Sequence, residues 1–318
     1  MKRIYFTLAA AVLTATVSSA ATRLIKVPVE VKGISTETTL NVTVKQSDAP
    51  AKVTVTGPDK AIVNEINATV TGANLRIHTT HKPVKGTNYG ERYKNITIVY
   101  EGALPSDYQA SSSGKIKVVN PLSKDGDVNI SVSSSGDVEI PSVSCSTLRL
   151  AGSSSGDIDI VNVSTKAINI GASSSADVEI SNVKCTELNM SVSSSADIDI
   201  KNLVADNTNA SVSSSAKVEI DNVIGKSLNL NASSSSEVDI DKCSVTSVTA
   251  ISSSNADINL HSLKTETLIT NASSGSDITI SGSASNATLS ASSGGSVVRK
   301  KFSCSSPTIS ASSGGKVK

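Results

Sequence analysis

The residues of this chain that could do chemistry are carboxylates that recur every 20 residues. They occupy two phases, two residues apart: the first runs from Asp137 to Asp277, interrupted by Lys217, and the second runs from Glu139 to Asp239. The first four units supply Asp137, Glu139, Asp157, Asp159, Asp177, Glu179, Asp197 and Asp199. Ca²⁺ prefers clustered carboxylate oxygens, and glycoside hydrolysis uses a pair of carboxyl groups. A calcium site and a polysaccharide-cleaving site are therefore the chemistries that these residue types could support.

The pattern nevertheless favours a solvated acidic face that keeps the protein soluble. The acids lack the Gly-x-Gly-x-Asp turns of calcium-binding β-rolls, which leaves Ca²⁺ on the acidic face as the weaker alternative. Because acids repeat in every unit, no single pair is distinguished as a catalytic pair. The fixed spacing from Asp137 to Asp277 also leaves no insertion that could build a deep pocket. We therefore expect no catalytic residues, no cofactor and no specific metal site.

The remaining reactive residue types do not form a recognisable constellation. His78, His81 and His261 have no carboxylates or thiols at metal-ligand spacing, and no histidine or acid is placed to activate a serine. Aromatic residues, which form the stacking platforms of sugar and nucleic-acid binders, make up 2 % of the chain. Lys and Arg number 29 against 28 acids, so the sequence predicts no nucleic-acid partner.

The acids lie within a strict repeat that predicts β-strands. The unit SSSGDVEI begins at Ser133 and returns as SSSGDIDI at Ser153, and the 20-residue spacing continues to Ser273. Val or Ile follows each acid of the first phase, and Ile or Leu follows two residues later, which is the two-residue period of a strand. A second alternating segment, such as INI at Ile168, completes each unit. A Ser-rich disordered stalk would not keep apolar residues in one phase over eight units.

Each unit is therefore predicted to be one coil of a single-stranded parallel β-helix, an all-β solenoid whose coils stack about 4.8 Å apart. Stacked Asn162, Asn182, Asn202 and Asn222 are expected to form a hydrogen-bonded ladder at one corner. Cys145 and Cys185 share a phase but lie two coils apart, about 9–10 Å, which is too far for a disulfide. With Cys243 and Cys304 a further three coils away each, four free thiols are expected.

The chain is predicted to have three parts. Residues 1–20 read as a signal peptide, with Lys2 and Arg3 before an apolar stretch and small residues before the cleavage site. Residues 21–129 lack the strict period and are expected to form irregular coils that cap residues 130–318, the regular β-helix. Within the cap, a short helix is expected over 58–67, a turn over 71–74, a strand over 95–100 and a surface loop over 81–94.

The order of these segments resembles a known family. LNVTVKQSDAPAKVTVTG, a short helix, TGANLRIHT and NITIVYE precede stacked coils of the form S-S-G/A-D followed by alternating apolar residues. This arrangement is similar to the auto-transporter adhesin head GIN domain family of the Bacteroidetes, and it covers the whole chain after the signal peptide. The resemblance implies a β-helix, and the name adhesin is given to that family by analogy.

These observations predict an exported, non-catalytic protein of the periplasm, the outer surface or the extracellular space. It is expected to be a structural or adhesion-type binding module for a cell-surface glycan or protein, and not to span the membrane. The alternative is a secreted polysaccharide lyase or glycosidase on a β-helix scaffold, which a single deep groove lined by acids with Arg or Lys would favour. Lys316 and Lys318 at the last coil predict a mainly monomeric protein with possible end-to-end association.

Overall fold

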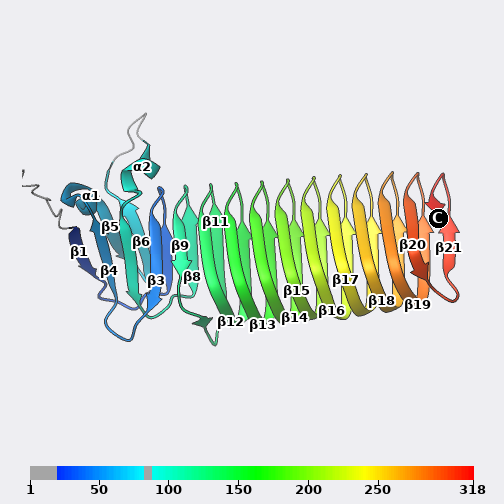
Figure 1. Cartoon of the computed structure of the whole chain (residues 1–318), viewed down its shortest axis with the longest axis horizontal. Coiled ribbons are helices and arrows are strands. Elements are labelled where there is room, and N and C mark those ends of the chain that lie inside the picture. The colour runs from blue at the N-terminus through cyan, green and yellow to red at the C-terminus, as the bar shows by residue number, and fades with distance from the viewer. Residues whose placement is uncertain (1–19, 82–87) are drawn as a thin grey trace, which may run out of the picture.

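The structure is a computed structural model that describes residues 20–81 and 88–318. In these residues the chain is nearly all β and forms a β-solenoid of about 11 turns (Figure 1). The predicted all-β parallel β-helix is therefore confirmed. The predicted signal peptide, except Ala20, lies outside the described residues. No helix in the described part of the chain is both long and apolar enough to cross a membrane.

The regular coils are 16-residue strands joined by four-residue turns. They are β12 (Asp137–Gly152), β13 (Asp157–Ala172), β14 (Asp177–Val192), β15 (Asp197–Val212), β16 (Lys217–Ala232), β17 (Glu237–Ser252) and β18 (Asp257–Ala272). Each strand pairs in parallel with the next at a register of 20 residues, as Ile158 with Val178 and Val178 with Ile198. Each strand bends midway, so that its two halves run along opposite faces of the solenoid (Figure 1).

The core lies between these two halves and consists of stacked aliphatic side chains. Val138, Ile158, Val178 and Ile198 are at most 1 % exposed, whereas the acids that flank them face solvent. Stacking aliphatic side chains in register fills the interior without aromatic rings, because each coil presents the same shape to the next. The predicted division between inward apolar residues and outward acids is confirmed.

The turn between coils is built from serines in a left-handed backbone conformation. Ser154 and Ser155 have φ values of 52° and 58°, and the Gly156 N–H donates to the Ser153 carbonyl at 3.1 Å. The Ser155 N–H donates to the Ser174 carbonyl of the next coil at 3.0 Å. Two consecutive positive φ values give the tight reversal that a two-residue turn requires. The bonds between successive turns offset the conformational cost of placing L-residues there.

One coil is a residue short, and the structure shows where the deletion is absorbed. β19 (Asp277–Ala291) pairs with β18 through a register shift between Leu260 and Leu263. Gly282 has a φ of 114° there, and a Cβ at this position would lie 2.2 Å from the Leu263 carbonyl oxygen. Only glycine therefore fits the shortened bend.

The final coils continue the parallel stack. They are β20 (Ser296–Ser303), β21 (Thr308–Ala311) and β22 (Lys316–Val317). β20 and β21 pair with β19, and β22 pairs with β20. Lys316 and Lys318 lie on this last coil, as predicted, and end-to-end association through it stays a prediction. All four cysteines are free, which confirms the expectation drawn from coil spacing.

The cap differs from the coils because it contains antiparallel pairs. β4 (Lys52–Gly57) lies between β1 (Ala21–Lys26) and β7 (Thr97–Gly102), antiparallel to both. β5 (Ile66–Thr71) and β6 (Asn74–Thr79) form a hairpin, and α1 (Lys60–Glu65) precedes it. The helix predicted over 58–67, the turn over 71–74 and the strand over 95–100 are thus all present.

The surface loop predicted over 81–94 is partly wrong. Residues 82–87 lie outside the described residues, but α2 (Tyr89–Tyr93) is a short helix whose start is capped by the Asn88 side chain. Tyr93 is buried and Arg92 pairs with Glu65 of α1. Tertiary contacts therefore stabilise a helix that is too short to be predicted from its sequence.

Short parallel strands connect the cap to the regular coils. They are β2 (Gly33–Thr36), β3 (Asn41–Gln46), β8 (Asp107–Ser111), β9 (Lys115–Val118), β10 (Leu122–Ser123) and β11 (Val128–Ser133). β8 lies between β2 and β11, and β9 lies between β3 and β12. Stacking in the manner of coils therefore begins before residue 130, and the place of the boundary between cap and regular coils stays a prediction.

Candidate functional site

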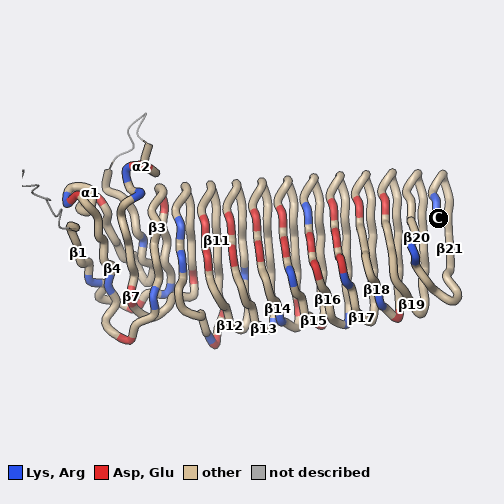
Figure 2. Tube along the Cα trace, in the orientation of Figure 1, with Lys and Arg blue, Asp and Glu red and all other residues tan. Residues whose placement is uncertain are grey.

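The predicted acids gather on one side of the solenoid, which we call the acidic face. It consists of the outward residues in the first halves of β12 to β19, and Figure 2 shows its acids on successive coils. Asp137 aligns with Asp157 and Asp177, and Glu139 aligns with Asp159, so the eight predicted residues form two neighbouring columns. Strand alternation explains this placement, because residues two apart on a strand share a face.

The opposite side, formed by the second halves of the same strands, is the amide face. Its central column is Asn169, Asn189, Asn209 and Asn229. The amide nitrogens of Asn189, Asn209 and Asn229 each donate to the amide oxygen of the preceding coil, at 3.3, 2.9 and 2.9 Å. Sequence reasoning missed this ladder, although asparagine every 20 residues was the signal that could have found it.

The predicted corner ladder is present over Asn162, Asn182 and Asn202, whereas Asn222 aligns with Asn202 but forms no side-chain hydrogen bond with it. Asn182 donates to Asn162 at 3.1 Å, and Asn202 donates to Asn182 at 3.0 Å. An amide both donates and accepts, so identical amides stacked one coil apart satisfy each other. The Asn ladders therefore hold coils together and leave few polar atoms for a partner.

Among the described residues, lysines pair with the carboxylate columns at two places. At the cap end, Lys115 pairs with Asp137 at 2.7 Å and Lys117 pairs with Glu139 at 2.8 Å. Farther along, Lys217 pairs with Glu219 at 3.0 Å and with Asp239 at 3.5 Å. Between these two places, the described residues supply no ion pair to the acids of β13, β14 and β15. Those acids are Asp157, Asp159, Asp177, Glu179, Asp197 and Asp199.

These environments shift the carboxyl pKa values in opposite directions. Partial burial and, next, repulsion from neighbouring acids raise the pKa values of Asp157, Asp159, Asp177 and Asp199. Hydrogen bonds from Lys115 and Lys117 lower the pKa of Glu139. The adjacent pair of Glu139 and Asp159 is therefore distinguished from the rest, which the repeating sequence did not lead us to expect.

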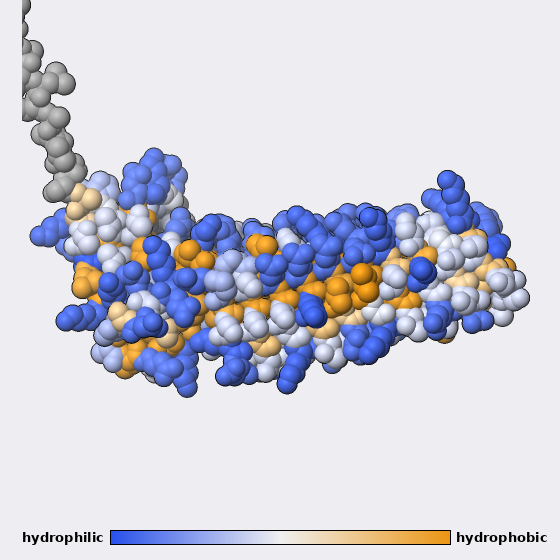
Figure 3. All heavy atoms as spheres, turned by 60° about the horizontal axis from the view of Figure 1, so that its bottom comes forward, coloured by the Kyte–Doolittle hydropathy of each residue, from blue (hydrophilic) through white to orange (hydrophobic). Residues whose placement is uncertain are grey.

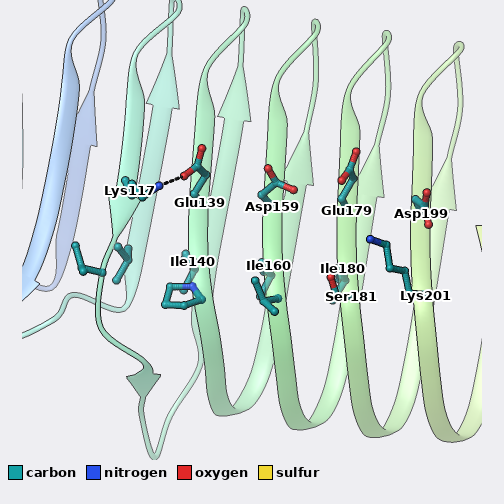
Figure 4. A pocket seen from close by; sticks show the side chains of 14 residues that line it. Lys117, Glu139, Ile140, Asp159, Ile160, Glu179, Ile180, Ser181, Asp199 and Lys201 are labelled. Atoms are coloured by element: carbon teal, nitrogen blue, oxygen red, sulfur yellow. Dashed lines mark hydrogen bonds and ion pairs between the residues drawn. The ribbon is translucent and has the colours of Figure 1, made fainter.

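A shallow groove lies beside the second carboxylate column (Figure 4). It has a volume of about 390 Å³, and its acidic wall is formed by Glu139, Asp159, Glu179 and Asp199. Val119, Pro141 and Val161 form its apolar floor, and Lys117 and Lys201 lie at its two ends. Figure 4 shows Lys201 pointing back across the groove toward the coil of Glu179 and Ser181.

The surface also carries an apolar stripe at the bend of the coils. Figure 3 shows this stripe running along the solenoid below a hydrophilic band. Val119 and Val161 are 48 % and 50 % exposed, and Val204 and Ile224 are exposed at the bend farther along. The sequence analysis expected no deep pocket and did not predict this shallow groove, because the groove depends on how the coils bend. An apolar strip next to a row of acids can hold an amphipathic cation.

The other candidate groups do not assemble into a site. His78 contacts Thr69 and Thr79 in the β5–β6 hairpin, His81 lies against Tyr89, and His261 lies on β18. Within residues 20–81 and 88–318, no group of three or more His, Cys, Asp or Glu residues is arranged to hold a metal ion.

A second charged cluster joins the two helices of the cap. The Arg92 guanidinium donates to both carboxylate oxygens of Glu65, and the Tyr93 hydroxyl donates to Glu65 at 3.0 Å. The hydrogen bond from Arg92 lowers the pKa of Glu65, although burial opposes it. Every member of the cluster has a partner inside the cap, so its role is to hold α2 against α1.

Comparison with solved structures finds similar chains at low sequence identity. A crystal structure of a "putative adhesin" from Parabacteroides merdae is 13 % identical, with a TM-score of 0.46, covering 94 % of this chain and 96 % of that one. A "putative lipid binding protein" from Parabacteroides distasonis is 16 % identical, with a TM-score of 0.44, covering 94 % and 95 %. A "putative adhesin" from Bacteroides fragilis is 17 % identical, with a TM-score of 0.37, covering 94 % and 96 %.

No curated protein matches the sequence. The sequence does match a protein family twice in succession, over residues 31–223 and 223–318, which together cover the cap after β1 and all the regular coils. The family is described as "Putative auto-transporter adhesin, head GIN domain". The resemblance noted from the motifs is thereby confirmed, and the chain belongs to the auto-transporter adhesin head GIN domain family.

Proposed function

We propose that this chain is an exported, non-catalytic β-helix protein that acts as a structural or adhesion-type binding module at the cell surface or in the periplasm. The observation that carries the proposal is the acidic face, where carboxylates without ion pairs stack over β13, β14 and β15. Membership of the adhesin head family supports the same reading.

Rigidity is what makes such a face suited to binding. Each acid stands on a strand that is paired on both sides, so its backbone is fixed before a partner arrives. A fixed surface loses little conformational entropy on binding, which leaves more of the contact energy for affinity. Coils of equal length also place the same groups at regular intervals, which suits an extended partner better than a small molecule.

Export is supported by the N-terminal sequence. Residues 1–20 combine a basic start, an apolar stretch and small residues, as secretory signals do. Fractionation of cells that make a tagged protein, with protease treatment of intact cells, tests this part. Cleavage near Ala20 and recovery outside the cytoplasm are expected, and an uncleaved cytoplasmic protein would contradict it.

Binding is tested by adding the purified fluorescent protein to envelope preparations, a glycan array and divalent cations. We expect saturable binding to an envelope component that falls when Asp159→Asn and Glu179→Gln are combined. The matched control carries Asp257→Asn and Asp277→Asn, which remove the same charge elsewhere on the acidic face. If the protein bound saturably to none of these preparations, the proposal would be overturned. Ca²⁺ on this face stays a weaker proposal, and calorimetric titration with Ca²⁺ tests it.

One observation favours the alternative, a carbohydrate-active enzyme. Glu139 and Asp159 are aligned on adjacent coils, and their pKa values shift in opposite directions, as those of an acid and a nucleophile in a retaining glycosidase do. The groove beside them is lined by acids and two lysines, but it is shallow and carries no aromatic platform. Release of reducing or unsaturated ends from polysaccharides, lost in Glu139→Gln, would establish the enzyme. We expect no release from either protein.

A further inference from the structure

We propose that the groove beside the acidic face binds an extended polypeptide segment in which Lys or Arg alternates with small apolar residues. The proposal rests on the binding function proposed above and names the partner for that surface. It follows from three features of the groove, namely its length, its charge and its floor. Each feature limits the ligand independently.

The length of the groove fits a short extended segment. From Lys117 to Lys201 it crosses five coils, because Lys117 aligns with Glu139, and Asp159, Glu179 and Asp199 follow in register. Four steps of about 4.8 Å give roughly 19 Å, and an extended chain rises about 3.3 Å per residue. About six residues would therefore fill it.

The charge of the groove favours a ligand with positive charge in its middle. Asp159, Glu179 and Asp199 receive no ion pair from the described residues, whereas Glu139 is already held by Lys117. Lys201 points into the far end, so a segment with an acidic residue there would bind in one direction (Figure 4). Charge complementarity of this kind fixes register and orientation.

The floor of the groove calls for apolar side chains. Val119 and Val161 are about half exposed, and Pro141 lies in the same column on the coil between them. An extended chain sends alternate side chains to opposite sides, so lysines can face the acids while apolar residues cover the floor. A glycan is disfavoured, because no aromatic ring lines the groove to stack on a sugar.

The mode of binding is also constrained. The strands under the groove are already hydrogen-bonded on both sides, so the segment must cross them rather than add a strand. Its affinity then comes from side chains, and lysine stems can lie along the valines while their ammonium groups reach the acids.

The experiment measures binding of a labelled, end-capped hexapeptide, Val-Lys-Val-Lys-Val-Lys, by fluorescence anisotropy. Controls are the same peptide with Glu for Lys and with Ser for Val. We expect binding of the Val-Lys peptide alone, weakened by salt. Combined Asp159→Asn and Glu179→Gln should weaken it about tenfold, since exposed ion pairs each contribute about threefold. Combined Asp257→Asn and Asp277→Asn, outside the groove, should change it less than twofold, within about 0.5 kcal/mol.

The floor is tested separately by Val161→Ser, which leaves the charge unchanged. This substitution should weaken binding about threefold, because the two methyl groups of Val161 that the peptide would partly bury are lost. Equal weakening by the two charge variants would show diffuse attraction and overturn the proposal. Equal affinity for the Ser-Lys peptide would overturn the role of the floor. Binding of a glycan in the groove, with no peptide binding, would overturn this inference and leave the binding function intact. Loss of all envelope binding would instead overturn the proposed function.

Discussion

The two faces of the solenoid share one backbone and one core, yet their outward columns behave in opposite ways. On the amide face, Asn209 donates to Asn189 and accepts from Asn229, both at 2.9 Å. On the acidic face, Asp157 and Asp177 are stacked in the same register but only repel each other. A 20-residue repeat therefore reinforces a side chain that can donate and accept, and penalises one that carries a charge.

This difference separates a structural face from a face that is available to a partner. The amides contribute to coil stacking and are largely satisfied by it. The carboxylates of β13 to β15 do not stabilise the stacking of coils, so we infer that their role is in solubility or binding. The groove with its apolar floor points to binding, since solubility alone would not place exposed valines beside the acids.

The largest expected effect falls on what the two faces share. Ile180 lies under the acidic face and Leu228 under the amide face, and both are essentially unexposed. Ile180→Asp and Leu228→Asp should each destabilise the protein by more than about 4 kcal/mol, because each buries an unpaired charge between coils. Thermal unfolding followed by circular dichroism measures this. If the protein folded with either substitution, the stacked aliphatic side chains of the core would not be what stabilises the coils.

A smaller effect on stability is expected when a carboxylate, typical of the acidic face, is placed on the amide face. Asn209→Asp removes the donor to Asn189 and places a charge in the ladder. We expect a loss of about 1–2 kcal/mol, because one hydrogen bond is lost and a half-buried amide pair is left incomplete. Urea unfolding measures the loss, and Asn209→Ser serves as a neutral comparison. Unchanged stability of Asn209→Asp would mean that the ladder is incidental.

The pH dependence of local stability should differ between the acidic face and the cap. The folded-state pKa values of Asp157 and Asp177 are raised above the ordinary 3.8, so the folded state binds protons more readily than the unfolded state. Stability of these coils therefore rises as the pH falls from neutral toward about 4. Glu65 has a lowered pKa, so its contribution is present above about 4.5 and is lost only below it.

Hydrogen exchange at pH 7 and pH 5, corrected for intrinsic rates, resolves the two regions. Protection of β13 and β14 should increase at pH 5, while protection of α1 and α2 should not change. The gain should be modest, because solvent screens half-exposed carboxylates. Weaker protection of the coils at pH 5 would contradict the assigned direction of the pKa shifts.

The smallest expected effect on stability is that of a single acid on the acidic face. Glu179→Ala should change the free energy of unfolding by less than about 0.5 kcal/mol, because the side chain is exposed and has no partner among the described residues. The same substitution should weaken binding of the basic hexapeptide. If Glu179→Ala and Ile180→Asp had equal effects on unfolding, the division between inside and outside would be wrong.

The sequence allowed the coils to be predicted because their apolar residues recur in one phase. The spacing of Val138 and Ile158 predicts strands, and the spacing of Asn162 and Asn182 predicts a ladder of stacked amides. The cap offered no such period, so the antiparallel pairing of β4 with β1 and β7 could not be read from it. The helix around Arg92 was missed for a related reason, since its partner Glu65 is 27 residues away.

The candidate site was only half predictable. Strand alternation placed Asp159 and Glu179 on one outward column, and the structure keeps them there. The groove depends on how the strands bend after Ile140 and on exposed Val161, which no local pattern encodes. The lowered pKa of Glu139 depends on Lys115 and Lys117, which come from the irregular coils, whereas burial raises the pKa of Asp159.

The central claim is that the acidic face is a contact face while the amide face is structural, and carboxyl footprinting tests it most directly. Carbodiimide labelling of exposed acids, read by mass spectrometry, is compared with and without the basic hexapeptide at saturation. The account predicts protection of Asp159, Glu179 and Asp199, with unchanged labelling of Asp257 and Asp277. Equal protection along the whole face, or none while the peptide is bound, would contradict it.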